Sequence, residues 1–160
     1  IKAGKQAQIT DDFMIIARIE ALIAQQGLEE ALRRANAYEK AGADAILIHS
    51  KMKTPDEIFQ FCDLYKGKLP LVVIPTSYPD VTLNELKTHK VKMVIYANQT
   101  LRVAHQAMKD LLTQILNQDN LANISKKISP MEDIFKLQEM YHIKKQEKEI
   151  ENNLKKLGYI

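Results

Sequence analysis

The feature that most constrains the fold is a fourfold alternation of short apolar runs with amphipathic helices. The apolar runs cover about residues 13–19, 43–50, 69–78 and 91–99, and the helices that follow them cover 28–42, 54–67, 83–90 and 100–117. Strands that are apolar throughout, each followed by an amphipathic helix, are typical of parallel βα units. The sequence therefore predicts an α/β protein with four such units.

Local signals mark the ends of several helices. The helix over 28–42 places its apolar residues on one face: Leu28, Ala31, Leu32, Ala35 and Tyr38. Gly42 then occupies the C-terminal capping position. Thr54 is expected to cap the next helix, with Pro55 at its first position. Ser129, followed by Pro130 and by a glutamate three residues later, has the pattern of a capping box.

The composition of the chain changes after Asn117. Residues 141–160 are rich in charged side chains, and their apolar residues form only a thin stripe: Ile143, Ile150, Leu154 and Leu157. A stripe this narrow cannot build its own core, so it is expected to lie against the rest of the protein or against a partner. We therefore expect two domains, residues 1–118 and a helical extension over 119–160.

Composition excludes several classes of protein. The net charge is only +3 with basic and acidic residues interleaved, which does not indicate a nucleic-acid surface. A single cysteine, Cys62, provides neither a disulfide framework nor a cysteine metal site, and suits a reducing compartment. No apolar run is long enough to cross a bilayer and no leader pattern opens the chain. A cytoplasmic protein is expected, with the mitochondrial matrix as the other reducing option.

Each of the four predicted strands ends in polar residues. These are Arg18 and Glu20, His49 and Ser50, Thr76 and Ser77, and Tyr96 and Asn98. In parallel α/β folds, ligands gather at the carboxyl edge of the sheet, where all of these residues would lie. The pattern predicts a ligand site at that edge.

Arg18 has two readings of about equal weight. A guanidinium cannot lose its proton, so it needs water, a carboxylate or an anionic ligand. Glu20 lies on the same side of the strand and could neutralise it in a structural ion pair. A guanidinium at a strand end is also suited to hold a carboxylate or phosphate bidentately. The residues alone predict an anion-holding Arg18 without naming the anion.

The other candidates have structural explanations. A lone histidine at a strand end is more often a hydrogen-bonded structural residue than an acid, base or ligand, although the position of His49 beside Arg18 favours a functional role. Helix capping is the default role for Thr76, Ser77 and Asn98. The histidines lack the spacing of a zinc site, so no metal-ligating residue is expected in this chain.

The stretches "IIARIEALIAQQG", "GADAILIHSK", "PDEI", "LVVIPTSY" and "VIYANQTLRVA" strongly resemble the C-terminal half of the phosphoenolpyruvate mutase family, in the isocitrate lyase superfamily. The resemblance runs over about residues 1–134. It implies that the four units are strands 5 to 8 of a (β/α)8 barrel. It also implies an isomerase that interconverts phosphoenolpyruvate and phosphonopyruvate with Mg²⁺, in phosphonate biosynthesis. A homo-oligomer is implied too, because the superfamily typically exchanges its last barrel helix between subunits.

The resemblance also implies roles for individual residues. Arg18 matches the arginine that holds the substrate and His49 a histidine beside it, which implies catalytic and substrate-binding roles for both. Ser50 and Thr76 match positions at the barrel mouth and are expected to bind substrate, and Asn98 also lies there. Gln99 stands where the family usually has a histidine.

A complete barrel needs roughly 250 residues. The Mg²⁺ ligands and the gating loop expected from the family lie on its third and fourth strands, outside this sequence. We therefore expect these 160 residues to be one part of a longer polypeptide. Two other readings stay open: phosphonopyruvate hydrolysis or carbon-carbon lyase chemistry on the same scaffold, and a non-catalytic binding or structural homologue.

Overall fold

The computed structural model describes residues 1–118, 122–126 and 128–159. The chain divides into two compact units, Ile1–Gln99 and Thr100–Ile160. The predicted domain boundary between residues 118 and 119 adjoins a segment outside the described residues, and it stays a prediction.

The first unit contains one parallel four-stranded sheet in the order β1-β2-β3-β4. The strands are β1 (Ile16–Ile19), β2 (Ala45–Ile48), β3 (Leu71–Val73) and β4 (Val91–Val94). The predicted parallel arrangement of the four strands is confirmed. The strands are shorter than predicted. For β3 the reason is that Pro70 and Pro75 flank it, and proline has no N–H to donate to a neighbouring strand. Phe13 and Met14, which precede β1, are exposed rather than paired in the sheet.

Helices alternate with the strands as predicted. They are α2 (Gly27–Lys40), α3 (Asp56–Leu64) and α4 (Leu83–Thr88). A further helix, α1 (Lys2–Gln6), precedes the first predicted strand. The Lys5 ammonium lies 3.0 Å from the Asp44 carboxylate, just before β2, and this contact docks α1 on the sheet. The contact joins residues 39 positions apart, so local sequence patterns cannot reveal it.

The capping predictions had mixed outcomes. Gly42 follows α2 with φ of +92°, which confirms its capping role. The Thr54 prediction was wrong, because its hydroxyl donates to the Asp56 carboxylate at 2.7 Å while Pro55 is the N-cap residue of α3. The Ser129 capping box was also wrong, since α7 begins after Pro130 and has no side-chain cap. A short polar side chain can satisfy a neighbouring side chain instead of the helix end.

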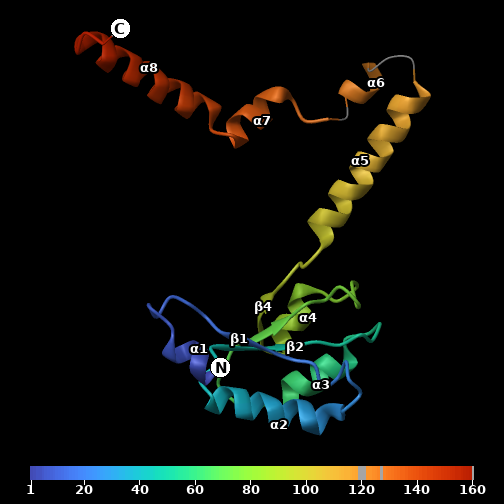
Figure 1. Ribbon diagram of the computed structural model, residues 1–160. Helices are drawn as coiled ribbons and strands as arrows, with labels where there is room; N and C mark the ends of the chain where they lie inside the picture. Colours follow the sequence, from blue (N-terminus) through green and yellow to red (C-terminus); the bar gives the residue numbers. More distant parts are fainter. Residues whose placement is uncertain (119–121, 127, 160) are drawn as a thin grey trace. The chain divides into compact units, whose positions relative to one another are not determined.

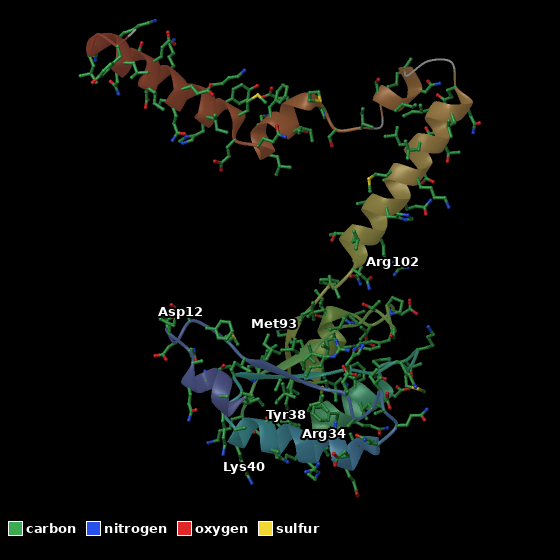
Figure 2. All side chains as sticks on the ribbon, in the orientation of Figure 1. Asp12, Arg34, Tyr38, Lys40, Met93 and Arg102 are labelled. Atoms are coloured by element: carbon green, nitrogen blue, oxygen red, sulfur yellow. The ribbon has the colours of Figure 1, made fainter. Side chains whose placement is uncertain are left out.

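The two faces of the sheet have different surroundings. Figure 1 shows α2 and α3 along one face of the sheet. That face carries the larger core, which includes Ala17, Ile19, Ile46, Ile48 and Val73 with residues of α2, α3 and α4. The opposite face carries a smaller apolar cluster, formed by Ala45, Leu47 and Val72 with Ile16, Ile74 and Ile95 packed against them. In Figure 2, Tyr38 of α2 and Met93 of β4 lie on opposite sides of the sheet.

The second unit is helical. Its elements are α5 (Gln99–Asn117), α6 (Ala122–Ser125), α7 (Met131–Leu137) and α8 (Met140–Lys156). The first residue of α5, Gln99, is the last residue of the first unit. The Tyr141 hydroxyl on α8 donates to the Glu132 carboxylate on α7 at 2.6 Å. The apolar stripe of the C-terminal segment is exposed throughout: Ile143, Ile150, Leu154 and Leu157. Across the described parts of the chain, no helix combines the length and apolarity that a bilayer span requires.

Candidate functional site

The register of the sheet places two of the predicted site residues, Arg18 and His49, on the face with the smaller apolar cluster. Arg18 pairs with Leu47 across β1 and β2, and Leu47 belongs to that cluster. Side chains two residues apart point to the same face of a strand. His49 is therefore the next side chain after Leu47 on this face, and Glu20 the next after Arg18. The small apolar cluster forms the floor below these polar groups.

Arg18 and Glu20 form an ion pair at the edge of the sheet, which was one of the two readings of Arg18. The Arg18 Nε–H donates to the Glu20 carboxylate. The two side chains are 47% and 45% exposed, so neither is sealed off from solvent. Nε is the guanidinium nitrogen that donates to Glu20, and about half of the Arg18 side chain stays in contact with solvent. The two readings of Arg18 are thus compatible with each other.

His49 lies in the field of this ion pair. It is half-buried, and its Nδ1 is buried with no hydrogen-bond partner among the described residues. Burial lowers the pKa of His49, the Arg18 cation lowers it further, and Glu20 opposes both effects. The lowered pKa favours the neutral imidazole, in which one ring nitrogen donates a hydrogen bond and the other accepts one, according to the tautomer.

Ser50 is fully buried, and its hydroxyl is already engaged by protein groups. It donates to the Glu57 carboxylate on α3 and accepts the N–H of Met52 at 3.0 Å. These bonds fix the loop that follows β2 and so set the position of His49. The predicted substrate-binding role of Ser50 stays a prediction. Glu57 was not singled out from the sequence, where the only signal was an acidic residue in the first turn of the following helix.

Other strand ends present buried polar atoms without partners in the described part of the chain. These are Thr76 Oγ1, Tyr78 OH and Asn98 Oδ1. Burying a polar group without a hydrogen bond is costly, so such atoms point to a ligand, water or chain segment that completes them. Burial raises the pKa of Tyr78 to about 12, so its phenol stays protonated. The substrate-binding role predicted for Thr76 stays a prediction.

The loops after β1 and β2 also border a cavity of about 250 Å³. Its lining includes Leu22, Lys51, Met52 and Glu57. Glu57 thus contacts both the cavity and the Ser50 hydroxyl. Arg18 and His49 do not line this cavity. They lie above the small apolar cluster, at the polar edge of the sheet that forms the candidate site.

The described residues do not fit a magnesium site by themselves. Among residues 1–118, 122–126 and 128–159, no group of three His, Cys, Asp or Glu side chains is placed to hold a metal ion. Mg²⁺ prefers several carboxylate or other oxygen ligands at once. Within the described residues, this edge presents Arg18 as a cation and His49 as a hydrogen-bonding group.

Comparisons with known proteins agree on one family. The profile of the family described as phosphoenolpyruvate phosphomutase matches residues 1–116. Phosphoenolpyruvate phosphomutase of Tetrahymena pyriformis is 42% identical over 92% of this chain and 49% of its own length. Phosphonopyruvate hydrolase of Variovorax sp. (strain Pal2) is 44% identical over 86% of this chain and 48% of its own length. The chain spans about half the length of the curated relatives it matches.

Solved structures give the same result. The structure of phosphoenolpyruvate phosphomutase from Streptomyces platensis subsp. rosaceus has a TM-score of 0.90 at 43% identity, over 92% of this chain and 52% of that one. A phosphonopyruvate hydrolase structure in complex with oxalate and Mg²⁺ has a TM-score of 0.86 at 42% identity, over 89% of this chain and 51% of that one. The likenesses confirm the predicted fold class, half of a (β/α)8 barrel followed by helices.

Proposed function

Because the chain belongs to the phosphoenolpyruvate phosphomutase family, we propose that the protein containing it interconverts phosphoenolpyruvate and phosphonopyruvate. This chain supplies Arg18 and His49 to the active site. The observation that carries the proposal is the half-exposed Arg18 on the same face of the sheet as His49, whose pKa is lowered by burial and by the Arg18 charge. A fixed cation beside a neutral hydrogen-bonding ring suits a small substrate that carries carboxylate and phosphoryl charges.

Arg18 acts as the anion clamp in this proposal. During the isomerisation the phosphoryl group leaves the enol oxygen and bonds to the methylene carbon, so one P–O bond breaks and one P–C bond forms. The substrate carries the same net charge before and after. Arg18 holds an anionic group in place while the charge is redistributed, and Glu20 holds Arg18 in position. His49 orients the substrate through a ring N–H without adding a second positive charge.

We propose Mg²⁺ as the cofactor, with ligands outside the described residues. Support comes from the Mg²⁺ in the related hydrolase structure and from the lack of a metal-ligand cluster within residues 1–118, 122–126 and 128–159. When bound, the ion would supply additional positive charge to the substrate. The proposal also includes a cytoplasmic homo-oligomer that works in phosphonate biosynthesis. The exposed apolar stripe on α8 is compatible with an exchanged C-terminal helix.

The experiment is a Mg²⁺-dependent reaction of the full-length natural protein with phosphonopyruvate, followed by ³¹P NMR. A new phosphoenolpyruvate resonance supports the mutase. Pyruvate and inorganic phosphate instead would identify a hydrolase, the second candidate, which the 44% identity to the Variovorax enzyme favours. An intact, folded protein that leaves phosphonopyruvate unchanged would contradict both enzyme assignments and support a non-catalytic homologue.

Arg18→Ala tests the role of the clamp. We expect kcat to fall about a hundredfold to a thousandfold, the usual effect of removing a transition-state electrostatic contact. Because Arg18 is half-exposed, the circular dichroism spectrum should not change. Arg18→Lys should recover only part of the rate, since an ammonium cannot bind bidentately. Activity of Arg18→Ala within a few-fold of the wild type would remove Arg18 from the mechanism.

A further inference from the structure

A second cationic site lies at the opposite edge of the sheet from Arg18 and His49. It is a pocket of about 390 Å³ lined by residues around the beginnings of β3 and β4. Four of its lining residues are lysines: Lys66, Lys68, Lys90 and Lys92. We call this set the lysine pocket. Its volume falls in the range of pockets that bind small ligands.

The lysine pocket has an unbalanced charge. No acidic side chain is among its lining residues, and none of its four ammonium groups forms an ion pair in the described part of the chain. The one hydrogen bond recorded for these ammoniums runs from Lys66 Nζ to the Asp63 carbonyl oxygen at 3.0 Å. Four like charges around one cavity repel each other unless an anion lies between them.

The carboxylates nearest to the pocket are occupied elsewhere. Glu39 accepts the Lys68 backbone N–H at 2.9 Å and the Tyr65 hydroxyl at 2.8 Å, one with each oxygen. These two bonds lower the pKa of Glu39, and the charge of the Lys68 ammonium lowers it further. Asp63 lies 2.8 Å from His89 Nδ1. Asp63 therefore serves another partner, and Glu39 offsets part of the Lys68 charge. Lys66, Lys90 and Lys92 keep no acidic partner in the described part of the chain.

Lys90 adds an independent observation. It follows α4 with φ of +64°, in the left-handed region where glycine is the favoured residue. A lysine there carries a backbone strain that glycine would avoid. The side chain of this residue lines the lysine pocket.

We propose that the lysine pocket binds a small phosphorylated anion, the chemistry shared by inorganic pyrophosphate and the phosphate chain of a nucleotide. Ammonium groups are effective phosphate donors, and four of them can surround several phosphate oxygens at once. Tyr65, Leu69 and Pro70 form an apolar wall of the same pocket. The proposal is independent of the proposed mutase function, because the two sites lie at opposite edges of the sheet.

Calorimetric titration of the full-length natural protein with sodium pyrophosphate, without added metal, tests the proposal. We expect saturable binding that weakens as sodium chloride is raised, because salt screens the lysines. Lys90→Gln/Lys92→Gln should weaken pyrophosphate binding about tenfold, because each exposed lysine is expected to contribute a few-fold to the affinity. Lys51→Gln/Lys53→Gln, which removes the same charge from the exposed loop after β2 at the other edge of the sheet, should leave affinity within about twofold. Equal weakening in both double variants would overturn the proposal.

Two further variants separate binding from folding and from the candidate active site. Lys90→Gly removes one ammonium and relieves the left-handed strain, so its Tm should not fall while its pyrophosphate affinity does. Arg18→Ala should retain pyrophosphate binding, and loss of binding in that variant would assign the anion to the other site and overturn the proposal. ATP should bind and adenosine should not. Adenosine binding as tightly as ATP would also overturn it.

Discussion

Arg18 and Glu20 hydrogen-bond to each other from adjacent same-face positions at the end of β1, while both remain about half exposed. The pair is both a structural ion pair and a candidate binding group for an anion. Glu20 restricts the guanidinium to one orientation, and solvent access leaves room for an anionic guest. Burial has the largest effect on the pKa of His49, and the two charges of the pair also act on it.

We predict that the charges of this pair move the pKa of His49 in opposite directions. Arg18 lowers the pKa of His49 and Glu20 raises it. Glu20→Gln should therefore lower this pKa further, whereas Arg18→Gln should raise it. The imidazole C–H resonances, followed by NMR across a pH titration and assigned with His49→Gln, measure both effects. Lys40→Gln, at the far end of α2, serves as the control and should leave the titration in place. Identical curves for all variants would show that the pair is remote from His49.

We predict that the bond from Ser50 to Glu57 stabilises the loop after β2. Glu57→Ala leaves the buried Ser50 hydroxyl without its acceptor, which should cost about 1–3 kcal/mol of unfolding free energy. Glu57→Gln keeps an acceptor oxygen and should cost less. Urea denaturation measures both variants. Because the loop carries His49, Glu57→Ala should also lower kcat, and equal stability of all three proteins would contradict the assigned contact.

The arrangement of the sheet could be predicted because its signal is local. Each apolar run and each helical stripe lies within one element, and the parallel order follows from their alternation. The helix α1 could not be predicted, since the ion pair between Lys5 and Asp44 that docks it joins distant parts of the chain. Strand lengths were overestimated because an apolar residue such as Phe13 favours a strand even where it has no partner.

In the candidate site too, local patterns could be predicted from the sequence and contacts between distant residues could not. The twofold periodicity of a strand places Arg18 and Glu20 on one side, and the structure shows the expected pair. The contact between Ser50 and Glu57 crosses from a loop to a helix, where no periodicity applies. The lysine pocket likewise joins Lys66 and Lys68 with Lys90 and Lys92 from separate parts of the chain, so no local pattern indicates their convergence.

We predict that Asp44 makes the stability of the first unit sensitive to acid. The Ile15 N–H at 2.7 Å, followed by Lys5, lowers the pKa of Asp44 below its usual value of 3.8. The unfolded chain then binds more protons than the folded chain in this window. Stability is fully present above about pH 3.8 and is lost as pH falls toward the lowered pKa.

Thermal unfolding at several pH values tests this linkage. The wild-type Tm should fall steeply as the pH is lowered below about 3.8. Asp44→Asn should have a lower Tm at neutral pH and a smaller fall of Tm on acidification. Asp12→Asn alters an exposed acid in the preceding loop, labelled in Figure 2, and should follow the wild-type curve. Parallel curves for wild type and Asp44→Asn would contradict the linkage.

We predict that Phe61 is a principal anchor of α3. Its side chain is fully buried in the larger core, and its ring stacks with Tyr65 at a centroid distance of 5.9 Å. Phe61→Ala removes these contacts and leaves a cavity, which should lower the unfolding free energy by about 3–5 kcal/mol. Leu64→Ala, on the same helix with a side chain 51% exposed, should cost far less. Urea denaturation of the two variants checks the difference, and similar losses would place Phe61 outside the core. Because α3 also carries Glu57, destabilising its packing should reduce the hold on Ser50 and so on the loop of His49.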